Sequence, residues 1–421
     1  MRGEGDIIIT STVNEQARWK ALGVFTTIYL LAGFLGMSIA PLAPFIQDDL
    51  CLSKAELGLF ISALYLGSII TGYVAGWLSD RWSIYKTLIL GLLLEAVLIG
   101  ALWVVYLFPW MLVLYLVAGF GYGTINPATS KGVIFWFPPE RRATAMAIKQ
   151  TGFTVGSMLA SMALPFVAVL TSWRWSILAA AVLTLFCGMI CILFYPASAE
   201  PTRTVASSSN IRHQSGKNTW TGEVVLWSAI CVFYAAVQGA GTAYLAVYMV
   251  KQFFYSAVAA GVFLALAQGG GALGRIVWGW VSDRWFTNKR KKELVVIGFI
   301  AAAATILFGL IPPNTPHFII GILAAIFGFT AIGYNAIFLT VIGEIAGREK
   351  AGQATGLAIT IGYLGIIAGP PVFGLIADKT GNFSLPWIIY GAALTLATCV
   401  AMVYAKKKPV AEKTGAAGNF T

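Results

Sequence analysis

Charged residues are scarce in this sequence. Asp, Glu, Lys and Arg make up only 11% of its 421 residues, whereas hydrophobic residues make up 58%. The core of one soluble chain of this length cannot hide so much apolar surface, which excludes an ordinary soluble protein. The sequence therefore predicts a protein that lies in a lipid bilayer.

Patterns that would indicate catalysis or a bound cofactor are also missing. The chain has only two histidines, and its five cysteines follow no metal-ligand spacing. It contains no phosphate loop that ends in Lys and Ser or Thr, and no nucleophile–base pair stands out. We therefore expect no enzyme activity, no cofactor and no metal site, and we interpret the cysteines as small apolar filler.

Twelve apolar runs are long enough to cross a membrane, because a helix needs roughly 20 residues to span the hydrocarbon core. We place them at residues 20–46, 55–79, 84–106, 110–136, 143–169, 174–195, 220–250, 256–281, 293–312, 317–343, 351–377 and 384–405. The first run exceeds a signal-peptide core and has no cleavage site, so we expect it to remain as a helix. The predicted fold class is an all-α membrane protein of twelve transmembrane helices.

The positions of the basic residues predict how the chain is oriented. The net charge is +11, and most of the 28 Lys and Arg lie in the tails and in alternate loops. The opposite loops carry only Lys54, Arg174, Lys251 and Lys379. By the positive-inside rule, both termini are cytoplasmic in a multi-pass protein of the inner (cytoplasmic) membrane. The basic charge thus indicates orientation in a lipid bilayer, and we expect no nucleic-acid partner and a monomer.

The twelve runs divide into two similar halves. Residues 196–219 read as a polar cytoplasmic linker between an N-terminal six-helix bundle, 1–195, and a C-terminal six-helix bundle with a basic tail, 220–421. An internal repeat supports this division, because four positions recur at a constant spacing along the chain. Gly119, Asn126, Ala147 and Gly156 match Gly328, Asn335, Gly356 and Gly365.

A second repeat joins the second and third spans of each half. The copies read Gly72-Tyr-Val-Ala-Gly76-Trp-Leu-Ser-Asp80-Arg81 and Gly279-Trp-Val-Ser-Asp283-Arg284. This pattern resembles the loop motif of the major facilitator superfamily, G-x-L-a-D-R-x-G-r-k, and Arg142 matches the basic residue usually found beside it. The resemblance implies that family's fold of two pseudo-symmetric bundles and a role in gating for this motif.

The residues of the motif have a physical reason to be there. Its glycines, Gly76 and Gly279, permit close approach of two helices. Its acid–base pairs can cap a neighbouring helix and form ion pairs across the bundle, which would hold one conformational state. A tight turn with a purely structural role is the alternative interpretation.

Three ionisable residues lie deep within predicted spans, namely Glu95, Lys149 and Arg275. Such groups cost several kcal/mol in hydrocarbon unless they are paired or face water, so each is a candidate functional residue. We expect Glu95 to be structural or protonated. Gln268-Gly-Gly-Gly-Ala-Leu-Gly-Arg275 resembles span eight of the oxalate/formate exchanger and the monocarboxylate transporters, which implies that Arg275 binds a carboxylate. A tether to a backbone carbonyl or to Glu95 is the alternative.

Lys149 is predicted to add a second cation to the site, unless its side chain snorkels to the membrane surface. Polar residues on the predicted cavity-lining helices complete the candidate substrate site, although each alone is equally suited to helix–helix hydrogen bonding. They are Tyr29, Tyr122, Asn126, Tyr234, Gln238, Tyr334, Asn335 and Tyr363, with Tyr65 and Gln268 beside them.

The leading hypothesis is a secondary transporter that moves a small carboxylate anion, a monocarboxylate such as lactate or pyruvate, by alternating access. Symport with a proton is the favoured coupling, and anion exchange is the alternative. The chain departs from its relatives at Gly271, where typical monocarboxylate transporters carry an acid, and at 358–367, where the exchanger's lysine is missing. The alternatives are a multidrug or metabolite exporter of the same superfamily and a membrane sensor that no longer transports.

Overall fold

The chain was analysed as a computed structural model that describes residues 15–81, 83–196, 222–286, 289–347 and 350–405. The side chains of residues 72–81, 139–140, 143 and 351–352 lie outside the description. Most of the predicted linker and both tails also fall outside the described residues. The division into 1–195, 196–219 and 220–421 therefore stays a proposal at these boundaries.

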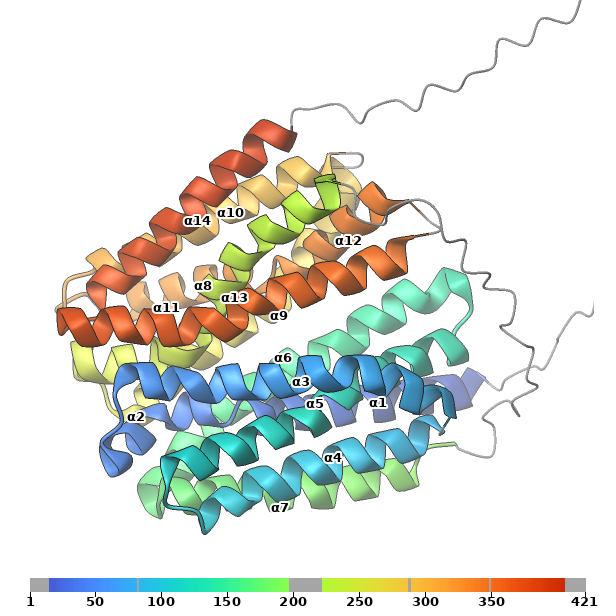
Figure 1. Cartoon of the computed structure of the whole chain (residues 1–421), viewed down its shortest axis with the longest axis horizontal. Coiled ribbons are helices and arrows are strands. Elements are labelled where there is room, and N and C mark those ends of the chain that lie inside the picture. Colours follow the sequence, from blue (N-terminus) through green and yellow to red (C-terminus); the bar gives the residue numbers. More distant parts are fainter. Residues whose placement is uncertain (1–14, 82, 197–221, 287–288, 348–349, 406–421) are drawn as a thin grey trace, which may run out of the picture.

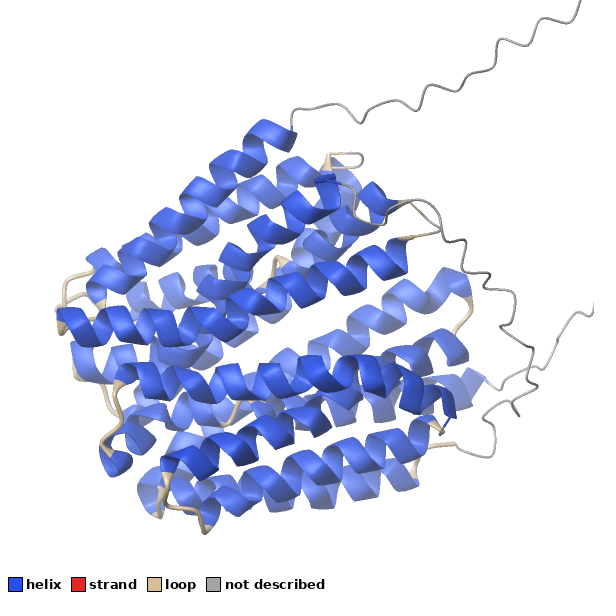
Figure 2. Cartoon of the chain, in the orientation of Figure 1, coloured by secondary structure: helices blue, strands red, loops and turns tan. Residues whose placement is uncertain are grey.

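The described residues form helices and contain no strand (Figure 2). Those of the first half are α1 Glu15–Gly36, α2 Ile39–Leu50, α3 Lys54–Arg81, α4 Ile84–Gly100, η1 Ala101–Trp103, α5 Phe108–Trp136, α6 Pro139–Leu170 and α7 Trp173–Leu193. Those of the second half are α8 Gly222–Phe253, α9 Ala257–Trp285, α10 Arg290–Leu310, α11 His317–Phe327, a π-helical turn Gly328–Ile332, α12 Asn335–Ala346, α13 Ala351–Thr380 and α14 Ser384–Ala405.

Within the described part, 12 helical segments are long and apolar enough to cross a membrane, which confirms the predicted number of spans. The first span is interrupted at residues 37–38, between α1 and α2, and the tenth contains the π-helical turn. Large apolar side chains such as Phe186, Leu396 and Leu193 point outward and are 65%, 69% and 75% exposed. This surface suits contact with lipid acyl chains rather than water.

The repeat noted in the sequence has a counterpart in helix packing. A methyl group placed on Gly156 would collide with the backbone of Leu30 on α1, and one placed on Gly365 would collide with the backbone of Val232 on α8. The fifth span of each half, α6 or α13, thus packs on the first helix of the same half, α1 or α8, through a matched glycine. Small residues allow this approach, which brings helices together where no hydrophobic effect between them operates.

Two bundles result, α1–α7 and α8–α14, and Figure 1 shows them one above the other. The most extensive contacts between them are those of α3 with α13 and of α6 with α9, and α2 adds contacts with α8 and α9. In Figure 1 the ribbons of the two bundles lie closest at the end where α3 begins and α13 ends. We call this the latch end, and the opposite end, where α1 begins, the far end.

Hydrogen bonds between the halves fix the latch end. Asp378, near the end of α13, accepts from the backbone N–H groups of Lys54 and Ala55 at 3.0 and 2.9 Å, so it caps the first turn of α3 in the other half. The Lys54 ammonium donates to the carbonyl of Ala377 at 3.0 Å. A second link joins Lys251 to Asp48 at 2.5 Å. We call the contacts of Asp378 with Lys54 and Ala55 the latch.

Candidate functional site

Arg275 lies at the interface between the halves. Its guanidinium, on α9, donates from Nη1 to the carbonyl of Gln150 on α6 across 3.4 Å, which is a weak hydrogen bond. Its Nε has no hydrogen-bond partner in the described part of the chain, and the groups that interact with it electrostatically there are tyrosine hydroxyls rather than acids. The predicted alternative of a tether to Glu95 is wrong, because neither carboxyl oxygen of Glu95 has a partner among the described residues.

Lys149 stands one residue before the carbonyl that Arg275 contacts. Its side chain is fully buried, so the snorkelling interpretation is wrong. The ammonium donates to Oδ1 of Asn126 at 2.6 Å and to Oγ of Ser130 at 3.0 Å, both on α5. Because these acceptors are neutral, they satisfy hydrogen bonds of the ammonium without neutralising its charge.

Tyr29 connects the two cations. The Lys149 ammonium lies 4.4 Å from the centre of its ring, a cation–π contact, and the Tyr29 hydroxyl interacts with Arg275. The hydroxyl groups of Tyr65 and Tyr122 also interact with the guanidinium. Tyr29 thus interacts with one cation from each half, and the use of these two cations as a clamp for an anion stays a prediction.

Tyr363 brings the second half to this group. Its ring packs edge-on against that of Tyr65 with 5.3 Å between centroids, and Tyr65 in turn contacts Tyr122 at 5.9 Å. These contacts place Tyr29, Tyr65, Tyr122 and Tyr363 around Arg275 and Lys149. We call these six residues the cation site.

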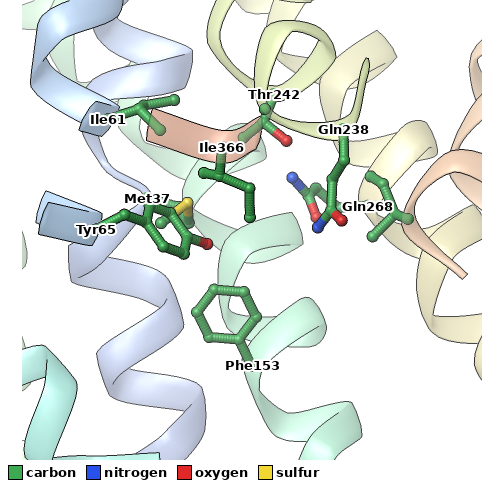
Figure 3. Close-up of a pocket in the computed structure, with 10 residues that line it drawn as sticks. Met37, Ile61, Tyr65, Phe153, Gln238, Thr242, Gln268 and Ile366 are labelled. Atoms are coloured by element: carbon green, nitrogen blue, oxygen red, sulfur yellow. The ribbon is translucent and has the colours of Figure 1, made fainter. Parts of the chain in front are cut away.

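A small cavity adjoins the cation site, because Tyr65 belongs to both (Figure 3). Met37, Ile61, Tyr65 and Phe153 line it from the first half, and Gln238, Thr242, Gln268 and Ile366 are among the residues that line it from the second. Its volume is about 20 Å³, which is room for about one water molecule. Neither Arg275 nor Lys149 lines it, and Phe153, one helical turn after Lys149, lies between.

The amides predicted to bind substrate contact one another in the second half. Nδ2 of Asn335 donates to Oε1 of Gln238 at 3.2 Å, and also to the carbonyl of Ile332, the last residue of the π-helical turn. Both side chains are partly exposed, and Gln238 lines the small cavity. Asn335 therefore holds the amide of Gln238 in place at the cavity wall.

Tyr234 does not belong to the site that the sequence predicted for it. It is 1% exposed, and its hydroxyl donates to the carbonyl of Leu294 on α10 at 2.9 Å, inside the second bundle. Tyr334 is also buried, and its ring packs on Tyr234 with 5.0 Å between centroids while its hydroxyl contacts Sγ of Cys231. Tyr334 still interacts electrostatically with Arg275, so it lies behind the cation site rather than in it.

The gating motif is described only in its second copy. Asp283 pairs with Arg290 at 2.8 Å, and Arg290 also pairs with Glu344 on α12. Arg290 and Glu344 were missed by the sequence reasoning, which placed the motif's basic residue at Arg284, an exposed side chain. Asp283 and Arg290 are seven residues apart and lie on different helices, so their spacing in the sequence did not indicate that they pair.

Two further expectations for this motif have different outcomes. The close helix approach predicted at Gly279 is wrong for the described residues, because a methyl group placed there would meet none of their atoms within 4 Å. Arg142 donates from Nε to the carbonyl of Phe137 at 2.9 Å. The side chains of Gly76, Asp80 and Arg81 lie outside the described residues, so the predicted pairing of Arg142 with the first copy stays a prediction.

Twelve apolar helices in two matched bundles, with cations and aromatic hydroxyls where the bundles meet, define a membrane transport protein. The sequence model of the Major Facilitator Superfamily matches residues 25–370 and 289–419. The chain belongs to this family of transporters, which confirms the predicted family and fold and the prediction that it is not an enzyme.

Known relatives match along most of the chain. The hexuronate transporter of Bacillus subtilis (strain 168) is 25% identical over 378 residues, which are 86% of this chain and 88% of the relative. Monocarboxylate transporter 11 of Mus musculus is 26% identical over 385 residues, 86% of this chain and 80% of the relative. The crystal structure of a D-xylose–proton symporter superimposes with a TM-score of 0.76 at 17% identity and covers 93% of this chain and 99% of that one.

Proposed function

We propose that this protein carries a small organic anion across the membrane by alternating access, with a monocarboxylate such as lactate or pyruvate as the substrate. Arg275 carries the proposal: a guanidinium between the two halves, partly exposed, with a free Nε and no acid paired with it among the described residues. Its planar fork of donors matches the two oxygens of a carboxylate.

The cation site favours an anion over a neutral or cationic substrate. Two positive charges without an acidic partner in the described structure repel each other, and an anion placed between them relieves that repulsion. The tyrosine hydroxyls supply further donors, and Gln238 and Gln268 supply amides at the neighbouring cavity. The names of these two relatives agree with this chemistry, because hexuronates and monocarboxylates are both carboxylates.

Alternating access requires that one end of the protein closes while the other opens. The latch end holds the hydrogen bonds between the halves described above. With both termini in the cytoplasm of the cell, as the positive-inside rule predicts, the latch end faces outward and the present structure is the state closed to the outside. We further propose that the protein acts as a monomer in the inner membrane.

Uptake into proteoliposomes tests this function. Purified protein reconstituted with labelled lactate outside and an inward proton gradient accumulates lactate if the proposal is right. The Arg275→Ala variant loses this uptake by about 100-fold, because removal of one partner of a desolvated charge pair costs roughly 2–5 kcal/mol. Lys292→Ala is the matched control, since it removes an exposed cation of the second half and leaves uptake unchanged.

Lactate uptake by Arg275→Ala at the rate of the unchanged protein contradicts the assignment of the residue. D-glucuronate serves as a second probe in the same assay, because a hexuronate adds hydroxyl groups that Gln238 and Gln268 can bind. Uptake of D-glucuronate with no uptake of lactate moves the substrate from a monocarboxylate to a sugar acid. If neither lactate nor D-glucuronate is taken up, and cells that express the protein are protected from toxic hydrophobic cations, the result supports a multidrug exporter instead.

A further inference from the structure

A carboxyl group without any partner lies inside the first half. Glu95, on α4, is 0% exposed, and neither Oε1 nor Oε2 has a hydrogen-bond partner among the described residues. An isolated carboxylate in such a place costs many kcal/mol, and a protonated carboxyl costs far less. Glu95 is therefore expected to hold a proton in the present state.

The surroundings of Glu95 supply polar groups but no charge. Tyr115 and Tyr122 face Glu95 from α5, and Gly36 faces it from the end of α1. Helix α7 packs on α4 both before and after Glu95, through Gly188 against Leu92 and through Ala181 against Gly100. Beyond the end of α4, the guanidinium of Arg174 donates to the carbonyls of Leu102 and Val105 at 3.2 and 2.7 Å and not to Glu95. No described residue neutralises Glu95 by an ion pair.

Glu95 adjoins the interruption of the first span. A methyl group placed on Gly36, the last residue of α1, would lie 3.0 Å from Oε1 of Glu95. Ser38, at the start of α2, is fully buried, and its side chain faces the hydroxyl of Tyr115. Tyr115 donates to the carbonyl of Gly36 at 2.8 Å and also interacts with Ser38 and with the N–H of Ile39. The acid thus lies beside a break in the helix that Tyr115 holds together.

The same break reaches the cavity between the halves. Met37, between Gly36 and Ser38, lines that cavity, and Tyr122 lies 3.3 Å from the methyl position of Gly36. Tyr122 belongs to the cation site and interacts with Tyr65, which also lines the cavity. A change of angle at residues 37–38 therefore moves Glu95's surroundings and the substrate's surroundings together.

We propose that Glu95 is the proton-binding site of this transporter. When the break is open to the outside, the carboxylate takes up one proton from that side and is buried as the neutral carboxyl. When the break opens to the cytoplasm, the carboxyl releases this proton there and becomes a carboxylate again. One proton then crosses with each anion, and no other reactant is needed. This inference rests on the proposed anion transport and assigns the coupling ion of that transport to a residue outside the cation site.

Two assays on the same proteoliposomes separate coupling from transport. Counterflow, in which unlabelled lactate inside exchanges for labelled lactate outside, needs no proton gradient. Accumulation driven by acid outside needs one, and about one pH unit concentrates an anion about tenfold in one-to-one symport. Glu95→Gln, which mimics the protonated carboxyl, is expected to keep counterflow, to lose accumulation and to show no dependence on outside pH.

Glu293→Gln is the matched control. Glu293 is also a fully buried carboxyl whose oxygens have no hydrogen-bond partner among the described residues, but it lies at the start of α10, beside Arg290 and Asp283. This variant is expected to accumulate lactate with the pH dependence of the unchanged protein. If both Glu→Gln variants lose accumulation, burial of any acid explains the effect and the inference is wrong.

Glu95→Asp guards against a Gln variant that does not fold. The shorter acid still titrates, but it lies elsewhere relative to Ser38, so the midpoint of the pH dependence shifts. An unchanged midpoint, or proton-driven accumulation by Glu95→Gln, overturns the assignment of Glu95 while anion transport stands. Absence of counterflow in the unchanged protein, with lactate and with D-glucuronate, overturns the proposed function itself.

Discussion

A buried cation without an acidic partner is the unusual feature at the scale of single residues. Among the described residues, the ammonium of Lys149 contacts the neutral oxygens of Asn126 and Ser130 and the ring of Tyr29. Burying a charge in this way opposes folding unless a ligand of opposite charge compensates it. We propose that anion binding, rather than stability, is the reason for a lysine at this position.

Lys149→Met is expected to show this conflict directly. The variant binds lactate at least about tenfold more weakly, because a charge-assisted contact of roughly 1.5–3 kcal/mol is lost. It also melts at a higher temperature than the unchanged protein, because an unneutralised buried charge has been removed. Thermal unfolding with and without lactate measures both effects. A lower melting temperature together with unchanged lactate affinity contradicts the role given to Lys149.

Tyr29 and Tyr234 provide a comparison between a site tyrosine and a packing tyrosine. Tyr29→Phe is expected to weaken lactate uptake several-fold with little change in stability. Tyr234→Phe is expected to leave uptake unchanged and to lower stability by about 1 kcal/mol, since it removes one buried hydrogen bond to Leu294. Uptake and melting curves on both variants decide this, and the reversed result would return Tyr234 to the substrate site.

These two tyrosines also show what residue patterns can predict. Arg275 and Lys149 were found because ionisable groups in hydrocarbon are rare, whatever the packing around them. Tyr234 and Gln238 stand one turn apart on α8, so a helical pattern assigns them the same face. The long side chain of Tyr234 nevertheless reaches α10, while Gln238 lines the cavity. Only the positions of the neighbouring helices distinguish the two.

At the scale of helices, hydrogen bonds between α3 and α13 hold the two halves together at the latch end. Asp378→Asn keeps the size of the cap but removes its charge, so it weakens the bonds to the N–H groups of Lys54 and Ala55. A cap of this kind contributes about 1 kcal/mol, which is roughly a fivefold change in the ratio of two states. The latch end is therefore expected to open more often.

Spin labels at Val104 and Phe254 measure this opening. Both residues are exposed, 59% and 86%, and they lie in different halves. Phe254 is three residues after Lys251 of the latch end, and Val104 precedes Val105, which binds Arg174, the partner of Asp49. In Asp378→Asn the distance distribution between the labels gains a longer component. A distribution identical to that of the unchanged protein means that the latch does not control this end.

The glycines of the internal repeat indicate which helix–helix contacts are required for folding. Gly156→Val is expected to prevent folding or to cost several kcal/mol, because its methyl position overlaps the backbone of Leu30. Gly356→Ala is the matched control from the same repeat, since a methyl group there meets nothing within 4 Å. Size-exclusion profiles of the purified variants check this. Normal profiles for both would show that the packing of α6 on α1 tolerates a side chain.

The sequence predicted helix number and pairing better than it predicted helix interruptions. Twelve spans follow from the length of the apolar runs, and the matched glycines predicted the repeat. The break at 37–38 and the π-helical turn Gly328–Ile332 gave no such signal, because both depend on side chains from other helices. Tyr115 bridges the first, and the indole of Trp278 donates to the carbonyl of Phe329 within the second at 3.0 Å.

At the scale of the whole molecule, the two halves meet around one positively charged region. Arg275 from the second half and Lys149 from the first share Tyr29, and the latch joins the halves on one side of them. An anion bound there contacts both halves and therefore stabilises the arrangement in which they approach. This is the physical basis on which substrate binding would drive the change between states.

Titration calorimetry of purified protein with lactate tests this account most directly. The unchanged protein is compared with Arg275→Lys, which keeps the charge but loses the planar fork, and with Arg275→Ala, which loses both. The account predicts that affinity falls stepwise along this series and that the Ala variant shows no measurable heat of binding. Equal affinity for lactate in all three proteins would contradict it.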